Sequence, residues 1–245
     1  MLNLVLDFDG TMADTFKPSP NEIGVSEAYC LAVDELFGEK GGKALCAVGG
    51  LQNRAPIELI HALQAKGIRI SGRLEDAAEN LVKTKMEVLL REITPNWPLP
   101  CAGYAEFNEE LCRLSKRKKH LRLAILSSGH TSFIERTLKT WKKEWESLFW
   151  PSIIISDDNV RQLPISMEKK IKPSPFLFQL VREKMSEGSF FYFGDDPAKD
   201  GMLAVNAGVP FGWFSSGNKK ALPSEVVPFL TFSNWKEVAF VLEYL

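Results

Sequence analysis

The chain has few of the features that mark membrane proteins, zinc proteins and disulfide-rich secreted domains. No apolar run in its 245 residues approaches the roughly 20 residues that a membrane-spanning helix needs. It has only three histidines, and its four cysteines form no C-x-x-C pair. We therefore predict buried, reduced thiols at Cys30, Cys46, Cys101 and Cys112 in place of a zinc site or a disulfide framework.

Net charge is also nearly absent, because 30 Lys and Arg face 31 Asp and Glu, for a formal charge of -1. No overall field therefore attracts nucleic acid or an anionic membrane, and neither is expected as a partner. The basic run 116–120 lacks the interleaved aromatic residues of a nucleic-acid surface and is interpreted as a solvated helix end. No basic segment precedes the first apolar run, as a signal peptide would require, so we expect a cytoplasmic protein.

Short, nearly continuous apolar runs indicate a parallel sheet that is buried on both faces. They occur at Leu2–Phe8, Leu121–Leu126, Ile153–Ser156, Ser189–Phe193 and Pro210–Phe214. Helical patterns alternate with the later runs, from Ser132 to about Leu148, from Ser174 to about Glu187, and from Asp200 to Ala207. This alternation predicts an α/β fold with a doubly wound, Rossmann-like parallel sheet.

More than a hundred residues separate the first two predicted strands, which is far more than one crossover helix needs. Helical patterns at Glu22–Phe37, Pro56–Lys66 and Leu74–Ile93 fill this insertion, and prolines end it. A further helix, Tyr104–Lys118, leads into the second strand. We predict a core domain of residues 1–14 and 96–245, and a helical cap domain of residues 15–95.

Acidic side chains follow two of the predicted strands. Asp7 and Asp9 end the first, Asp195 and Asp196 follow the fourth, and Asp200 comes shortly after. Ligands of a doubly wound sheet bind beyond the carboxyl ends of its strands, so these carboxylates are expected to converge. Such a cluster needs a hard divalent cation or retained protons, and purely oxygen ligands favour Mg²⁺. No G-x-G-x-x-G turn follows the first strand, which argues against dinucleotide binding.

Four segments resemble, in order, the motifs of the haloacid dehalogenase (HAD) superfamily. They are Asp7-Phe8-Asp9-Gly10-Thr11, Ser127 after an apolar strand, Lys172-Pro173-Ser174-Pro175, and Gly194-Asp195-Asp196-Pro197-Ala198-Lys199-Asp200 followed by Ala207-Gly208. The place of the insertion is similar to that of the helical-cap subgroup, which includes phosphoglycolate-phosphatase-like enzymes. The resemblance implies a Mg²⁺-dependent phosphatase that acts on a small phosphorylated metabolite.

The resemblance also assigns roles to individual residues. Asp7 would attack phosphorus, and Asp9 would serve as general acid and base. Mg²⁺ would be held by the Asp7 carboxylate, the Asp9 backbone carbonyl and Asp195. Ser127 would bind a phosphoryl oxygen, and Lys172 would balance charge on the nucleophile and the transferring group. Without the neighbouring motifs, Ser127 would read as a helix cap and Lys172 as a solvated side chain.

Other residues have less specific assignments. Asp196 and Asp200 are candidates either for metal ligands or for groups that support the ligands. Candidates for substrate binding are Thr11, Ser128, Gly129 and, from a glycine-containing turn of the cap, Arg54. The segment 157–171 has no assignable role and is expected to be a surface loop.

Three other functions are alternatives to that of a phosphatase. A phosphomutase resembling β-phosphoglucomutase would pass the phosphoryl group to a sugar, and the motifs do not separate it from a phosphatase. A dehalogenase would dispense with Asp9 and with the metal, so the presence of Asp9 argues against it. A non-catalytic binding protein on this fold would not need the full set of acidic, hydroxyl and lysine positions. The sequence leaves the substrate open, and it leaves open whether the protein is a monomer or a homodimer.

Overall fold

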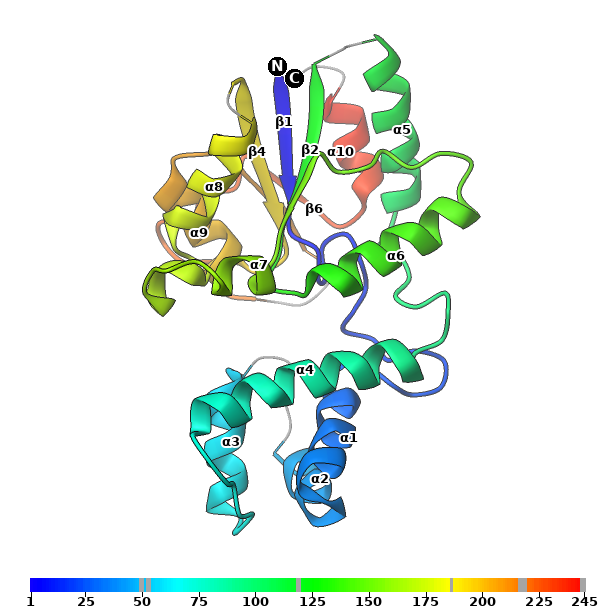
Figure 1. The fold of residues 1–245 in the computed structure, drawn as a ribbon. Coiled ribbons are helices and arrows are strands. Elements are labelled where there is room, and N and C mark those ends of the chain that lie inside the picture. Colours follow the sequence, from blue (N-terminus) through cyan, green and yellow to red (C-terminus); the bar gives the residue numbers. More distant parts are fainter. Residues whose placement is uncertain (49–50, 52–53, 118–119, 186, 216–219, 243–245) are drawn as a thin grey trace. The chain divides into compact units, whose positions relative to one another are not determined.

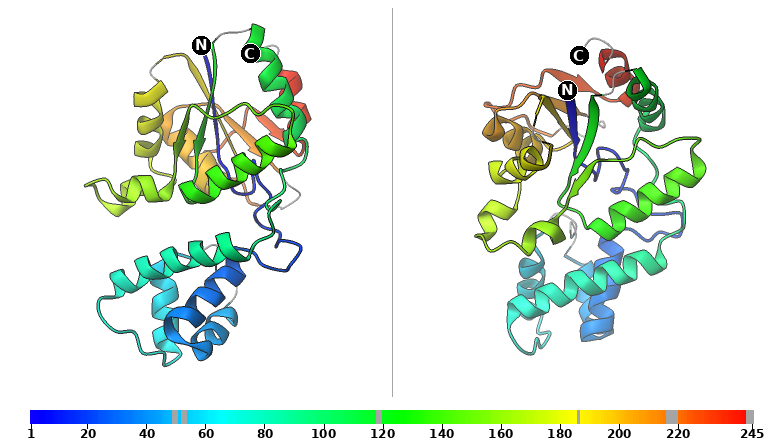
Figure 2. Two further views of the ribbon diagram at one scale, coloured as in Figure 1. Left: turned by 45° about the vertical axis from the view of Figure 1, so that its right-hand side comes forward. Right: turned by 45° about the horizontal axis from the view of Figure 1, so that its top comes forward.

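The computed structural model describes residues 1–245 except 49–50, 52–53, 118–119, 186, 216–219 and 243–245. The chain divides into two compact units, as Figures 1 and 2 illustrate. The first contains Met1–Asp14 and Pro98–Leu245, and the second contains Thr15–Trp97. The second unit is therefore an insertion into the first, two residues longer at its end than the predicted cap of residues 15–95.

A six-stranded sheet forms the centre of the first unit, in the order β3-β2-β1-β4-β5-β6 (Figure 1). All neighbouring strands are parallel, and the chain winds outward in both directions from β1. The predicted doubly wound α/β fold is therefore confirmed. The strands are β1 (Leu2–Leu6), β2 (Leu121–Leu126), β3 (Ile153–Ile155), β4 (Ser189–Gly194), β5 (Phe211–Phe214) and β6 (Leu230–Phe232).

Helices cover both faces of this sheet, with α8 and α9 on one side and α5, α6 and α10 on the other (Figures 1 and 2). Val5 and Tyr192 pack with the α8 side, whereas Phe193 contacts Trp235 of α10 with ring centroids 5.7 Å apart. The elements are α5 (Tyr104–Arg117), α6 (Thr131–Glu144), α7 (Asp157–Arg161), η2 (Met167–Lys170), α8 (Pro175–Met185), η3 (Pro197–Gly201), α9 (Met202–Ala207) and α10 (Trp235–Leu242). Among the described helices, none has the length and apolar character of a membrane span.

The sequence-based prediction missed several short elements of the first unit. The segment 157–171, expected to be a loop, contains α7 and η2. Strand β6 and helix α10 were not predicted, and the helix expected at Asp200–Ala207 is preceded by the π-helical turn η3. Elements of three to eight residues are too short to show a clear hydrophobic periodicity, so tertiary packing determines whether such a segment forms a helix or a strand.

The described part of the second unit contains the helices α1 (Val25–Phe37), α2 (Glu39–Cys46), α3 (Pro56–Ala65) and α4 (Leu74–Glu92). Helix α1 packs against α2 and α4, and α3 packs against α4. Helix α2 was not predicted because Gly41 and Gly42 are poor helix formers. They permit close contact with α1, since a Cβ atom at Gly41 would lie 2.9 Å from Val33 Cγ1.

The prediction of reduced thiols is wrong for two of the four cysteines. Cys30 of α1 and Cys46 of α2 form a disulfide with their Cα atoms 5.6 Å apart, whereas Cys101 and Cys112 are not disulfide-bonded. The pairing follows from the reversal of the chain at Gly38, which has a φ angle of 83° and folds α2 back along α1. Disulfides are uncommon in the reducing cytoplasm, which is the compartment that the sequence predicts.

Candidate active site

Asp7 lies at the carboxyl end of the central strand, where the chain leaves the sheet. Its N–H still donates to Phe193 O of β4 (2.8 Å), and Gly10 then turns the chain with a φ angle of 72°. Phe8 between the two aspartates is fully buried and contacts Phe133 of α6, with ring centroids 6.1 Å apart. Alternation along the strand therefore leaves the Asp7 carboxyl on the face opposite Phe8.

Three buried carboxylates meet at this edge of the sheet. One oxygen from each of Asp7, Asp195 and Asp200 lies within 4.8 Å of the others. Asp200 is positioned by η3, where it accepts hydrogen bonds from Tyr192 Oη (2.7 Å) and from Asp196 N (3.1 Å). Gly194 makes room for it, because a Cβ atom there would lie 2.5 Å from Asp200 Cβ.

Lys172 joins two of these carboxylates. Its Nζ donates to Asp7 Oδ1 (2.6 Å) and to Asp200 Oδ1 (2.7 Å), and only 4% of its side chain is exposed. The ammonium also lies 5.6 Å from the ring centroid of Tyr192. These contacts fix Lys172 in place beside the predicted nucleophile.

The site carries more negative than positive charge. Burial raises the pKa of Asp7 well above its usual value, with Lys172 opposing the shift and the neighbouring carboxylates adding to it. Burial likewise raises the pKa of Asp195. For Lys172, burial lowers the pKa, but Asp200 and Asp7 outweigh it, so the net pKa is raised and the ammonium stays charged. The cluster therefore has a deficit of positive charge that a proton or a divalent cation can fill.

Ser127 and Gly129 border Asp9. Ser127 is 5% exposed at the end of β2, and its Oγ accepts from Gly129 N (2.8 Å) and donates to Asp9 Oδ2 (3.3 Å). Gly129 N occupies one lone pair of Ser127 Oγ and so orients the hydroxyl, whose proton points at Asp9 Oδ2 and can be passed to another acceptor in the site. A Cβ atom at position 129 would lie 2.8 Å from Asp9 Oδ2, so the glycine leaves room for the Asp9 carboxyl in this position.

The remaining predicted site residues have different surroundings. Thr11 is fully buried, and its hydroxyl donates to Asp7 Oδ2 (3.4 Å). Asp196 caps η3 by accepting from Ala198 N (3.0 Å) and Lys199 N (3.2 Å). Ser128 is exposed, and Arg54 is an exposed residue of the second unit. The roles of Thr11, Ser128, Gly129 and Arg54 in substrate binding stay predictions.

Two residues of the site were missed by the sequence analysis. Tyr192 holds Asp200, and Lys220, beyond β5, donates through Nζ to Asp195 Oδ2 (2.6 Å). Trp213 of β5 also donates through Nε1 to Asp195 O (3.3 Å). Tyr192 reads as an ordinary buried strand residue, and no motif includes Lys220, so the sequence held no specific signal for either.

The donor set fits a hard divalent cation. Asp7, Asp195 and Asp200 are between 1% and 6% exposed and offer only oxygen ligands, as Mg²⁺ prefers. The excess negative charge of these carboxylates would be neutralised by a bound divalent cation. Asp200 belongs to this cluster, so it is a candidate ligand together with the predicted Asp7 and Asp195.

Without metal, the protein is expected to become more stable as the pH falls from about 7 to about 5, the range just above ordinary carboxyl pKa values. Asp7 and Asp195 have raised pKa values in the folded state, so the folded protein binds more protons than the unfolded chain in this range. Their contribution to stability is greatest at low pH and is lost as the pH rises. Glu106 and Asp158 have lowered pKa values and lose their contributions only at lower pH.

The measurement is the thermal midpoint in EDTA and in excess Mg²⁺ across that range. Mg²⁺ should raise the midpoint most near neutral pH, where it no longer competes with protons. An Asp7→Asn variant serves as the control, because it should reduce the slope in EDTA. A midpoint in EDTA that rises with pH would contradict the prediction.

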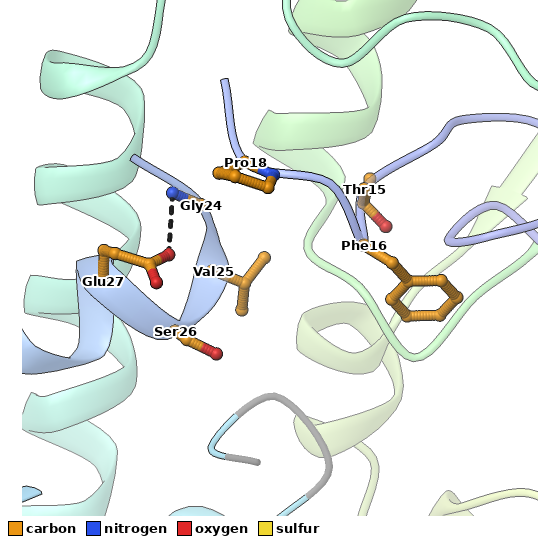
Figure 3. Close-up of a pocket in the computed structure, with 7 residues that line it drawn as sticks. All are labelled: Thr15, Phe16, Pro18, Gly24, Val25, Ser26 and Glu27. Atoms are coloured by element: carbon orange, nitrogen blue, oxygen red, sulfur yellow. Dashed lines mark hydrogen bonds between the residues drawn. The ribbon is translucent and has the colours of Figure 1, made fainter. Parts of the chain in front are cut away.

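A small pocket lies at the start of α1 in the second unit (Figure 3). Figure 3 shows that Glu27 points back toward Gly24, whose N–H donates to Glu27 Oε2 (3.0 Å). The pocket is lined by Thr15, Phe16, Pro18, Gly24, Val25, Ser26 and Glu27. None of these is a predicted site residue, and the group lacks the clustered carboxylates and lysine that phosphoryl transfer needs.

No family model and no curated protein sequence matches the chain. Solved structures match it over nearly its full length. A putative phosphoglycolate phosphatase from Lactobacillus plantarum has a TM-score of 0.59 at 17% identity, with 99% of this chain and 98% of that chain covered. A putative β-phosphoglucomutase from Thermotoga maritima has a TM-score of 0.56 at 17% identity, with both chains covered completely.

The putative HAD hydrolase YfnB from Bacillus subtilis, bound to magnesium, has a TM-score of 0.57 at 15% identity, with 98% of each chain covered. 2-Haloacid dehalogenases are also among the matches. The chain therefore has the fold of HAD-superfamily hydrolases, which confirms the predicted resemblance at the level of the fold. At these identities, the matches do not choose between phosphatase, mutase and dehalogenase chemistry.

Proposed function

We propose that the chain is a Mg²⁺-dependent phosphatase that hydrolyses a small phosphorylated metabolite through a phosphoaspartyl intermediate on Asp7. One observation carries the proposal. Three buried carboxylates converge at the carboxyl edge of the sheet, and the Lys172 ammonium lies 2.6 Å from Asp7 Oδ1. This combination offers a nucleophile with an ammonium group beside it for an anionic phosphoryl group, and oxygen ligands for a divalent cation.

In the first half-reaction, an Asp7 carboxylate oxygen attacks phosphorus, and the bond from phosphorus to the leaving oxygen breaks. Asp9 gives its proton to that oxygen. Lys172 stays charged because Asp200 and Asp7 raise its pKa, so it can offset charge on the phosphoryl oxygens. The Ser127 hydroxyl, whose orientation is set by Gly129 N–H, donates to one of those oxygens.

In the second half-reaction, Asp9 is a carboxylate and takes a proton from water as the water oxygen attacks phosphorus. The bond from Asp7 to phosphorus breaks, and inorganic phosphate leaves. Thr11, whose hydroxyl lies 3.4 Å from Asp7 Oδ2, and Lys172 then hold the regenerated Asp7 carboxylate. Each proton is thus returned, and Asp9 ends the cycle protonated.

Asp7, Asp195 and Asp200 are the residues that would hold Mg²⁺, with the Asp9 backbone carbonyl as the ligand that the motif resemblance adds. When bound, the cation would neutralise these carboxylates and the phosphoryl oxygens. That neutralisation would let an anionic substrate approach the pocket, whose carboxylates alone would repel it.

The test is the release of phosphate from p-nitrophenyl phosphate by the full chain, followed by a panel of phosphorylated metabolites. Activity should be abolished by EDTA and restored by Mg²⁺, and acid-quenched enzyme should contain an acyl phosphate that hydroxylamine cleaves. Activity that survives complete metal removal would overturn the proposal. Chloride release from 2-chloropropionate without phosphatase activity would identify a dehalogenase instead, and turnover dependent on a sugar bisphosphate would identify a mutase.

A further inference from the structure

A second lysine contacts the carboxylate cluster, through Asp195 and Asp196 instead of Asp7 and Asp200. Lys220 Nζ lies 2.6 Å from Asp195 Oδ2 and 3.6 Å from Asp196 Oδ2. It follows β5, the strand next to β4, whose carboxyl end carries Asp195. Trp213 of the same strand donates to Asp195 O (3.3 Å), so this neighbouring segment contacts both the backbone and the side chain of Asp195.

The two lysines differ in how firmly they are held. Each lies within 4 Å of two carboxylates, but only 4% of the Lys172 side chain is exposed, compared with 32% of the Lys220 side chain. A buried ammonium cannot leave its partners without a large desolvation cost, but a partly solvated one regains water when it moves away. Lys220 is therefore the cation of the site that can be displaced at low cost.

We propose that Lys220 is a positioning residue that competes with Mg²⁺ for Asp195 and so sets the affinity of the site for the metal. Its ammonium neutralises Asp195 while the metal is absent and must give up that contact when a divalent cation binds. The inference rests on the proposed function, because Asp195 is one of the groups assigned there to Mg²⁺. It predicts an enzyme with a weakened metal site that stays stable when metal-free.

The experiment is a calorimetric titration of Mg²⁺ into the metal-free full-length protein, with wild type compared with Lys220→Met. The variant should bind Mg²⁺ about tenfold more tightly, as the loss of a partly solvated competing ion pair allows. Its thermal midpoint in EDTA should fall, because Asp195 is left buried without a counter-charge. Saturating Mg²⁺ should remove most of that difference.

Two control variants separate competition from a general loss of positive charge. Lys220→Arg keeps the charge and should stay within about threefold of the wild-type affinity. Lys199→Met removes an exposed lysine of η3 and should change the affinity by less than about twofold, as expected for a solvent-screened charge. An equal gain in Lys199→Met and Lys220→Met would overturn the specific role of Lys220.

The outcomes also separate this inference from the proposed function. If wild type binds Mg²⁺ and Lys220→Met binds it equally or more weakly, the inference that Lys220 competes with Mg²⁺ is wrong, while the proposed function stands. If only Lys220→Met binds Mg²⁺, the competition holds and the metal dependence proposed for the wild-type enzyme fails. If neither binds Mg²⁺, both proposals fall.

Discussion

An Asp7→Asn variant is expected to lose about 10⁴-fold or more of the wild-type kcat, because it removes the nucleophile. The amide is a far weaker nucleophile than the carboxylate, although it has nearly the same size and can still accept a hydrogen bond from Lys172. The Asp7 side chain is also one of the three converging oxygen donors, so the variant's affinity for Mg²⁺ should fall as well. The assays are steady-state release of phosphate and detection of the acyl phosphate, and both signals should be lost.

The same variant should remain folded, which distinguishes a chemical defect from a structural one. Burial and the neighbouring carboxylates raise the Asp7 pKa, so the charged form of Asp7 costs stability near neutral pH in the metal-free protein. Asp7→Asn removes that cost, and its thermal midpoint in EDTA should equal or exceed that of wild type. Asp76→Asn, at an exposed position in the first turn of α4, is the matched control and should leave kcat unchanged. Substantial turnover in purified Asp7→Asn would reject Asp7 as the nucleophile.

The meeting of the first and fourth motifs could be predicted from the sequence because it depends only on strand order and register. Strands β1 and β4 are neighbours, and Leu6 pairs with Phe193. Their carboxyl ends therefore place Asp7 beside the residues that lead to Asp195. Such strands can be recognised in a single sequence by their continuous apolar runs, since both faces of the parallel sheet must be buried.

The contacts that refine the site depend on tertiary packing and could not be predicted. Asp200 was expected to ligate the metal, to support the ligands or to start a helix; the turn of η3 that brings it back against β4, where Tyr192 donates to it, has no pattern in the sequence. Lys220 reaches Asp195 only because β5 lies next to β4. The Cys30–Cys46 disulfide likewise depends on the hairpin of α1 and α2, and α2 contains two glycines that obscure its helical pattern.

An Asp9→Asn variant is expected to lower the steady-state kcat by about 10³-fold, as the loss of a general acid and base typically does. The two half-reactions should suffer unequally when the substrate is p-nitrophenyl phosphate. The p-nitrophenolate leaving group needs little help from a proton, so transfer to Asp7 should stay comparatively fast. Attack by water still needs a base, so the phosphoenzyme should accumulate.

Rapid mixing of Asp9→Asn with that substrate should therefore give a burst of about one equivalent of p-nitrophenol per chain, followed by slow turnover. An alkyl phosphate is the internal control, because its leaving oxygen requires the proton from Asp9 and the burst should disappear. Ser127 Oγ lies 3.3 Å from Asp9 Oδ2, and the amide oxygen of the variant side chain could still accept its hydrogen bond, so the loss reports on proton transfer instead of a collapsed site. Equal slowing of both half-reactions with p-nitrophenyl phosphate, or turnover like that of wild type, would show that Asp9 does not carry the proton.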